Sequence, residues 1–115
     1  MRLHHLAMRT GNLPDLVRFY SERLGLRVLQ RRDGSVWLDA DGTILMLEAR
    51  SEGEPSVPAG SMEMVAFAIR PEERPGWVTK LGGLVEAQTE FTLYFRDPDG
   101  RRVGLSHYQD VTPGE

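Results

Sequence analysis

Residues 3–28 read LHHLAMRTGNLPDLVRFYSERLGLRV, and this stretch predicts the strand–helix–strand opening of the fold. Segment 3–10 is interpreted as a strand, in which His5, Ala7 and Arg9 share one face because side chains alternate along a strand. A helix is predicted next, with Asn12 as its N-cap and Pro14 in the first turn, where a missing N–H breaks no helical bond.

The helix is predicted from an apolar face at helical spacing and from a glycine stop. The apolar face consists of Leu13, Leu16, Val17, Tyr20 and Leu24. Gly25 follows at the position where helices commonly end in the left-handed conformation. Segments 26–31, 35–40 and 43–49 are then predicted as three strands, separated by Asp-Gly pairs that favour tight hairpin turns.

The second half of the chain repeats this order after a linker at 50–61, which is rich in Gly, Pro, Ser and charge. A strand at 62–69 precedes a helix at 70–83, which we expect to begin late, near Trp77, because Pro75 and Gly76 lie inside it. Three strands follow at 84–90, 91–97 and 101–108, with DPDG at 97–100 as the last hairpin turn.

The two halves can be aligned with each other. HHLAMRT (4–10) aligns with EMVAFAI (63–69), and TILMLEA (43–49) aligns with RRVGLSH (101–107). Internal duplication fixes an architecture early. The sequence therefore predicts an α+β fold of two tandem βαβββ modules in a single domain, with module one at about 1–49, the linker at about 50–61 and module two at about 62–110.

Composition excludes several classes of function. The 115 residues carry a formal net charge of −3 and no cysteine, so disulfides, thiolate metal sites and a cysteine nucleophile are excluded. Lysine and arginine form no basic stripe, so no nucleic-acid partner is expected. No signal peptide is recognised, and no apolar run approaches the roughly 18 residues of a membrane span. We expect a cytoplasmic protein without a membrane partner.

Two signatures carry a resemblance to a known family. FYSERLGLRV (19–28) closes the first helix, and YFRDPDGRRVGLSHY (94–108) spans the last hairpin. Together with the paired modules they resemble the vicinal oxygen chelate superfamily, which includes glyoxalases, bleomycin resistance proteins and dioxygenases. The resemblance implies a curved, cup-like mixed sheet with helices outside, and a homodimer. One fold hosts many functions, so the resemblance identifies a scaffold and no particular reaction.

The resemblance also implies where a metal would be held, on the first and last strands of each module. The matching positions are His5, Glu48, Met64 and Gly104. Only His5 and Glu48 keep ligand chemistry, because a thioether suits hard divalent ions poorly and glycine has no side chain. Strand parity places His4, Glu63 and His107 on the wrong face. We expect no tightly held cofactor, and at most a weakly bound Ni, Zn, Mn or Fe ion at His5 and Glu48.

The absence of ligand side chains at Met64 and Gly104 argues against fosfomycin-resistance and extradiol dioxygenase activity. The resemblance associates both activities with a histidine on the first strand of each module and a glutamate on the final strand. The leading interpretation is a protein that binds a small organic molecule in its cup. The alternative is a glyoxalase-like lyase, isomerase or epimerase in which His5 and Glu48 are catalytic, with a weak metal or as a metal-free acid/base pair. A third is a partner-binding module whose cup is vestigial.

The expected ligand-binding residues face the cup. They are Arg9, Trp37, Met46, Met64, Ala66, Gly104 and Ser106. Arginine can hold a carboxylate or phosphate with its planar fork, and aromatic and methionine side chains suit flat or flexible apolar ligands. Arg9 is equally consistent with a solvated charge at the strand end, and Trp37 with ordinary core packing.

Overall fold

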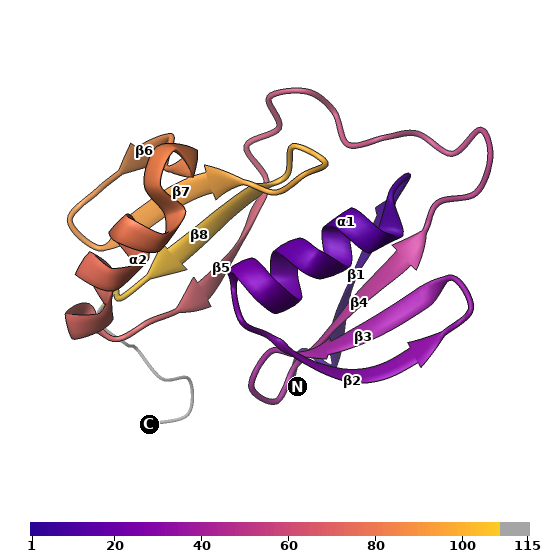
Figure 1. The fold of residues 1–115 in the computed structure, drawn as a ribbon, viewed down its shortest axis with the longest axis horizontal. Helices are drawn as coiled ribbons and strands as arrows, with labels where there is room; N and C mark the ends of the chain where they lie inside the picture. Colours follow the sequence, from indigo (N-terminus) through magenta and orange to yellow (C-terminus); the bar gives the residue numbers. More distant parts are fainter. Residues whose placement is uncertain (109–115) are drawn as a thin grey trace. The chain divides into compact units, whose positions relative to one another are not determined.

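The computed structural model describes residues 1–108, and the chain forms two compact units (Figure 1). The first unit comprises residues 1–60 together with the turn at 97–100, and the second comprises residues 61–96 and the described residues after 100. The turn therefore belongs by its contacts to the first unit, although it joins two strands of the second. Residue 110, the predicted end of module two, lies outside the described residues.

The first unit is a four-stranded mixed sheet with one helical segment. Its elements are β1 (His5–Thr10), α1 (Leu13–Arg18), the π-helical turn η1 (Phe19–Arg23), β2 (Arg27–Arg32), β3 (Ser35–Asp39) and β4 (Ile44–Ala49). The strand order is β1-β4-β3-β2, with β1 parallel to β4 and the other pairs antiparallel. The predicted βαβββ order is confirmed, although the first strand begins at His5 and not at residue 3.

The helix begins and ends through the residues that the sequence indicated. Asn12 Oδ1 accepts a hydrogen bond from the backbone N–H of Asp15 at 3.2 Å, and Gly25 has φ +81°. Between these ends the helix changes type, since the N–H of Leu24 donates to the carbonyl of Phe19, five residues earlier, at 3.1 Å.

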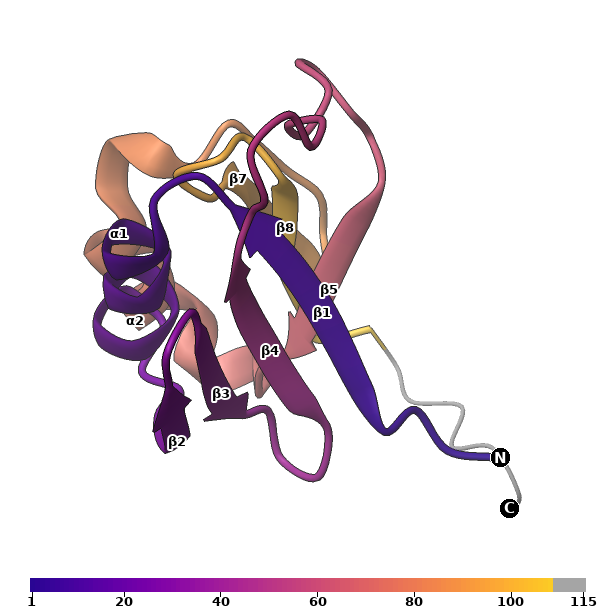
Figure 2. The same ribbon diagram turned by 90° about the vertical axis from the view of Figure 1, so that its right-hand side faces the viewer.

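The core of the first unit lies between α1 and the sheet face that it covers (Figure 2). Its fully buried apolar members include Leu16, Tyr20, Leu38 and Leu47. The Tyr20 hydroxyl donates a 2.8 Å hydrogen bond to Asp97 Oδ2, and both side chains are buried. Asp97 also shapes its own turn, because its Oδ1 accepts from the N–H of Asp99 at 2.9 Å. The two signature segments are thus joined by a direct hydrogen bond.

The second unit repeats the arrangement. Its elements are β5 (Met64–Ala68), η2 (Pro71–Glu73), α2 (Arg74–Leu81), η3 (Gly82–Leu84), β6 (Ala87–Gln88), β7 (Thr92–Arg96) and β8 (Arg102–Ser106). The strand order is β5-β8-β7-β6, with β5 parallel to β8 and the other pairs antiparallel. Its buried apolar residues are Leu81, Leu93, Phe95, Val103 and Leu105.

Two details of the second unit correct the sequence predictions. Helix α2 begins at Arg74 and not near Trp77, because Pro75 occupies the first turn, where its missing N–H breaks no helical bond. The predicted strand at 84–90 shrinks to Ala87–Gln88, because Gly82–Leu84 continues the helix as a 3₁₀ turn.

The predicted α+β class with paired βαβββ modules is confirmed. None of the helices formed by residues 1–108 has the length and apolar character needed to cross a membrane.

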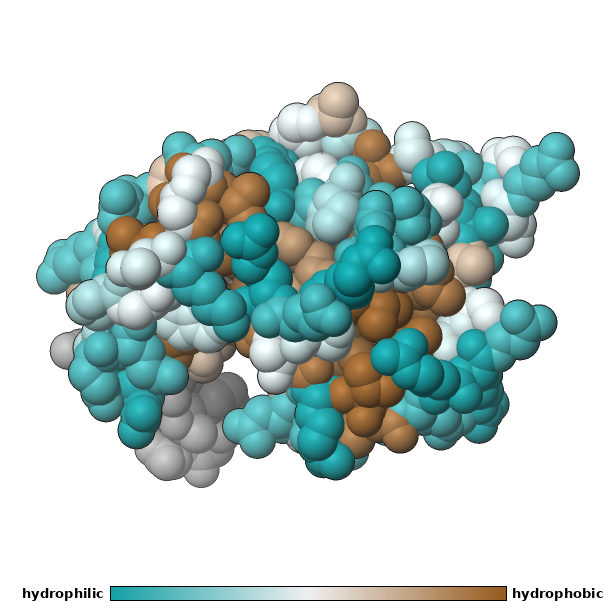
Figure 3. Space-filling model, viewed as in Figure 1, coloured by the Kyte–Doolittle hydropathy of each residue, from teal (hydrophilic) through white to brown (hydrophobic). Residues whose placement is uncertain are grey.

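Figure 3 shows apolar surface over the region of α1, β2 and β3, set among hydrophilic side chains. Leu29 on β2 is one of the exposed apolar residues.

Candidate functional site

The open face of the first sheet is the face turned away from α1 (Figure 2), and strand register arranges it in three rows. The rows, each running across β1, β4 and β3, are His5–Ile44–Asp39, Ala7–Met46–Trp37 and Arg9–Glu48–Ser35. His5, Ala7 and Arg9 are exposed, whereas the side chains on the inner face of β1, such as Met8 and Thr10, are buried. The predicted alternation of β1 is therefore observed.

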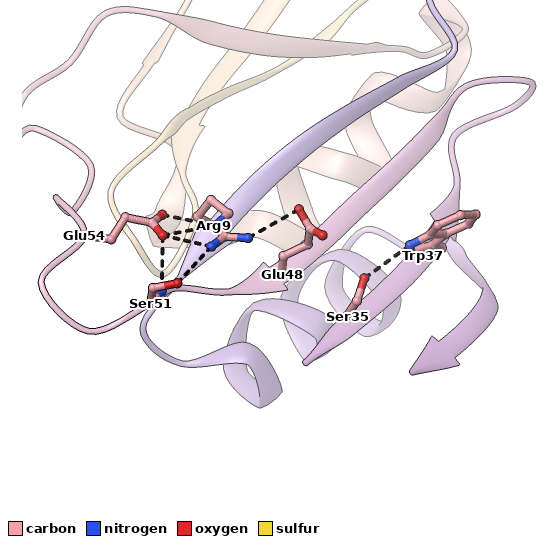
Figure 4. A network of polar contacts seen from close by, with 6 residues as sticks. All are labelled: Arg9, Ser35, Trp37, Glu48, Ser51 and Glu54. Atoms are coloured by element: carbon pink, nitrogen blue, oxygen red, sulfur yellow. Dashed lines mark hydrogen bonds and ion pairs between the residues drawn. The ribbon is translucent and has the colours of Figure 1, made fainter. Parts of the chain in front are cut away.

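Arg9 is held by acidic residues of its own unit (Figure 4). Its Nε and Nη2 donate to Glu54 at 2.8–3.3 Å, and its Nη1 lies 3.7 Å from Glu48 Oε1. Glu54 comes from the linker and also accepts the backbone N–H of Ser51 at 3.2 Å. One guanidinium thus faces two carboxylates, so this row has no net positive charge to offer an anionic ligand.

His5 and Glu48 lie in different rows. Parallel pairing puts His5 opposite Ile44 and Glu48 opposite Arg9, four residues further along the strands. That offset corresponds to about 13 Å at roughly 3.3 Å per residue. The partner of His5 is instead its neighbour, with the Nδ1 atoms of His4 and His5 2.9 Å apart. The structure does not bring together the predicted acid/base pair, whereas it does bring Glu48 to Arg9.

Trp37 and Met46 are neighbours in the middle row of the open face. The indole Nε1 donates to Ser35 Oγ at 3.2 Å (Figure 4), and the guanidinium of Arg32 lies 5.4 Å from the ring centroid. Both Trp37 and Met46 are half-buried. They form the apolar middle row of this face together with Ala7.

The contact between Arg9 and Glu54 predicts a pH dependence. The hydrogen bond from Arg9 lowers the pKa of Glu54, and the backbone N–H of Ser51 lowers the pKa further. A carboxyl group whose pKa is lower in the folded state than in the unfolded state stabilises the fold. The stabilisation is complete when the pH is above the unfolded-state pKa, and it is lost as the pH falls through the folded-state pKa. We expect the Glu54 side chain to titrate below the ordinary pKa of a glutamate when carboxyl ¹³C shifts are followed by NMR.

Arg9→Gln is the matched variant for this titration. It should move the Glu54 midpoint up toward the ordinary pKa of a glutamate, and added salt should have the same direction of effect because the pair is accessible to solvent. The same Glu54 midpoint in the unmodified protein and in Arg9→Gln would contradict the contact.

The open face of the second sheet has the corresponding three rows, across β5, β8 and β7. They are Met64–Arg102–Arg96, Ala66–Gly104–Tyr94 and Ala68–Ser106–Thr92. Ser106 accepts a hydrogen bond from the Thr92 hydroxyl at 2.9 Å, which leaves its own O–H able to donate. The predicted ligand-binding residues Met64, Ala66, Gly104 and Ser106 therefore all lie on one face of one sheet.

Met64 fills the space above Gly104. A Cβ atom built on Gly104 would lie 2.7 Å from the Met64 methyl and 3.3 Å from Thr92 Cγ2. The place that a side chain on residue 104 would take is therefore occupied by a thioether. His107, considered as a substitute ligand, is engaged elsewhere, with Nε2 3.2 Å from Arg74 Nη1 and its ring against Phe91.

The register of β1 with β4 and the register of β5 with β8 show which positions of the two modules are equivalent. His5 pairs with Ile44 as Met64 pairs with Arg102, so Met46 is equivalent to Gly104 and Glu48 is equivalent to Ser106. This differs from the expected match of Glu48 with the last-strand ligand position. Within residues 1–108, no group of three His, Asp or Glu side chains is placed to hold a metal ion.

Three residues of the second open face were missed at the sequence level: Tyr94, Arg96 and Arg102. The signal was available, since alternation counted back from Gly104 places Arg102 on the same face. The pairing of Arg102 with Arg96 requires the register of β7 and β8, which the turn at 97–100 sets.

Known proteins are similar to this chain in sequence and in structure. A family model described as Glyoxalase/Bleomycin resistance protein/Dioxygenase superfamily matches residues 2–105. A glyoxalase/dioxygenase from Nostoc punctiforme is similar, with a TM-score of 0.79 and 23% identity over 95% of this chain and 92% of that one. Lactoylglutathione lyase from Agrobacterium tumefaciens has a TM-score of 0.70 and 21% identity, covering 93% of each chain. Fosfomycin resistance protein FosX from Mesorhizobium loti has a TM-score of 0.79 and 16% identity, covering 96% and 93%.

Proposed function

Because the chain belongs to the Glyoxalase/Bleomycin resistance protein/Dioxygenase superfamily, we propose that it binds a small organic molecule and holds no tight metal ion. The proposed binding residues are side chains on the open faces of its sheets. They are Arg9, Trp37, Met46, Met64, Ala66, Gly104 and Ser106, as the sequence indicated.

One observation carries this proposal. Strand register relates His5, Met46, Met64 and Gly104 as equivalent first-strand and last-strand positions of the two modules. Only His5 among them offers a nitrogen or oxygen ligand, and Met64 fills the space beside Gly104. A divalent site needs three or four protein ligands, usually with N, O or thiolate donors. The donor set does not fit such a site.

The enzymatic alternative receives less support from the geometry. A lyase, isomerase or epimerase using His5 and Glu48 as an acid/base pair needs both groups at one reacting carbon. Glu48 is instead beside Arg9, four residues along the sheet from His5. The solved structures above support the fold, and their identities of 16–23% do not transfer an activity to this chain.

A ligand screen tests the proposal. We expect at least one compound from a library of small organic molecules to raise the thermal midpoint of the tag-free protein in the presence of EDTA, because a ligand that binds only the folded state stabilises it. Trp37→Ala should reduce that shift, and Leu29→Ala, at an exposed position on β2, should not. A library without any binder under metal-free conditions would count against the proposal.

The metal content of the purified protein tests the second part of the proposal, that no metal ion is tightly held. The protein is incubated with nickel, zinc, manganese and iron salts, dialysed, and analysed by mass spectrometry beside His5→Ala. We expect far less than one ion per chain in both proteins. About one ion per chain in the unmodified protein, lost in His5→Ala, would overturn the metal-free proposal and favour the enzyme.

The homodimer and the cytoplasmic location implied by the resemblance stay predictions. Sedimentation equilibrium on the purified chain decides the first, with twice the 13.0 kDa chain mass expected for a dimer. Cell fractionation decides the second.

A further inference from the structure

We propose that Arg102 and Tyr94 form a binding site for the anionic group of the ligand, a carboxylate or a phosphate monoester. The proposal rests on the proposed small-molecule function and adds the chemical class of the ligand. Both residues lie on the open face of the second sheet, in adjacent rows on β8 and β7.

The guanidinium of Arg102 stacks on an aromatic ring. Its Cζ lies 4.1 Å from the centroid of Tyr94, within the range of a cation–π contact. Stacking on a ring fixes the plane of the guanidinium, so less side-chain freedom is lost when its planar fork binds an acceptor. Arg102 is therefore presented in a set orientation, unlike a solvated arginine.

A second guanidinium, that of Arg96, lies beside Arg102. Arg102 pairs directly with Arg96 across β8 and β7, an arrangement of like charges that is unfavourable by itself. Glu86 is the carboxylate that both arginines share, with Arg96 Nε at 3.1 and 3.2 Å from its two oxygens and Arg102 Nε at 3.4 Å. Two guanidinium groups and one carboxylate leave a net charge of +1.

The hydrogen-bonding capacity of Glu86 goes mainly to Arg96, which also donates to the Ser61 carbonyl at 2.6 Å. Arg102 Nε is close to Glu86 but outside hydrogen-bond geometry. It is a buried side-chain nitrogen without a hydrogen-bond partner within the described chain. The Arg102 side chain keeps 16% of its surface exposed, and its terminal nitrogens make no hydrogen bond to residues 1–108. The fork is thus available to an acceptor that the described chain does not supply.

The contrast with Arg9 supports this assignment. Arg9 was the anion-binding candidate at the sequence level, but the structure gives it Glu54 and Glu48 as partners. Arg9 thus has two carboxylates of its own, whereas Arg102 shares the single carboxylate of Glu86 with Arg96. An incoming anion would have to displace Glu54 from Arg9, whereas at Arg102 it meets a guanidinium whose Nε has no hydrogen-bond partner within residues 1–108.

The surroundings of Arg102 suit the body of an organic anion. Gly104 follows two residues later on the same face and has no side chain, and the methyl group of Met64 lies over it. Ala66 is opposite Gly104 on β5. An apolar ligand body can pack against the Met64 methyl group and Ala66 with its anionic end at Arg102.

The test is an NMR titration of the uniformly ¹⁵N-labelled protein in phosphate-free buffer, with benzoate, phenyl phosphate and inorganic phosphate as separate probes. The Arg102 Nε–Hε signal and the backbone amides of 102–104 should shift saturably with benzoate or phenyl phosphate. Arg102→Gln should weaken binding about tenfold or more, because it removes a charge-assisted fork. The control Arg31→Gln, which removes the same charge from an exposed position on β2, should leave binding unchanged.

Two further variants keep the inference testable if Arg102→Gln fails to fold. Arg102→Lys retains the charge without the fork, and Tyr94→Leu removes the ring, so each should weaken binding. Absence of saturable shifts at 102–104, or equal affinity in these variants, would overturn the anion site. A ligand found in the metal-free thermal screen would in that case leave the proposed function standing. Response to benzoate alone, phenyl phosphate alone or inorganic phosphate identifies the anion that the site accepts.

Discussion

Asp97→Ala is expected to lower the free energy of unfolding by about 2–4 kcal/mol, because a buried hydroxyl and a part-buried backbone N–H lose their acceptor. The Tyr20 hydroxyl donates to Asp97 Oδ2, and the N–H of Asp99 donates to Oδ1. Both Tyr20 and Asp97 are buried, so bulk water cannot take the place of the lost acceptor and the tyrosine hydroxyl is left without a hydrogen bond to Asp97. Urea denaturation followed by circular dichroism measures the loss.

Three variants separate the causes of this effect. Asp97→Asn keeps an oxygen that can accept from Tyr20 and should cost less than Asp97→Ala. Tyr20→Phe removes the hydroxyl alone, with an expected loss of about 1–3 kcal/mol. The double variant Tyr20→Phe/Asp97→Ala should lose less stability than the sum of the two single losses, because both substitutions remove the same hydrogen bond. Strict additivity would show that the hydrogen bond contributes nothing.

Phe95→Ala is expected to cost about 3–5 kcal/mol, the usual range for deleting a buried aromatic side chain. Phe95 is fully buried on β7 opposite Val103. The second unit has few other large core side chains, so the cavity left by the ring would be a large defect. Against a typical stability of about 5–15 kcal/mol, this loss is a major fraction of the total.

The two tryptophans allow this loss to be located. Trp37 lies in the first unit and Trp77 in the second, so Trp37→Phe leaves a fluorescence reporter in the second unit alone, and Trp77→Phe leaves one in the first. We expect Phe95→Ala to shift the Trp77 transition at least as far as the Trp37 transition. Val78→Ala, at an exposed position of α2, is the control and should cost about 0.5 kcal/mol or less. A Phe95→Ala loss as small as this would contradict the core assignment.

Local sequence signals predicted most of the fold. Asn12, Gly25 and the Asp-Gly turns each act through neighbouring backbone, and the structure has the predicted cap, helix stop and a turn with positive φ at both Asp41 and Gly42. The errors were boundaries of the same local kind. Proline is compatible with a helix in its first turn and disfavoured further inside. Pro75 therefore allowed a helix that begins at Arg74 with Pro75 in its first turn, or one that begins after it near Trp77, and the sequence did not decide between them.

The candidate site was less predictable because it depends on pairing between strands far apart in the sequence. Alternation correctly assigned faces to His5, Arg9 and Glu48, but it does not give the register between β1 and β4. That register separates His5 from Glu48. The ion pair of Arg9 with Glu54 depends on the path of an irregular linker, which no periodic pattern specifies.

The bond between Tyr20 and Asp97 joins residues 77 positions apart, and it has a consequence for how the protein is made. During synthesis on the ribosome, α1 and the strands of the first unit emerge well before the turn at 97–100 that belongs to the same unit. The nascent first unit therefore lacks the Asp97 acceptor of the Tyr20 hydroxyl until residues 97–100 have been translated, after strands β5, β6 and β7. Its final consolidation is a late event that coincides with formation of the second sheet, and a chain released early lacks that step.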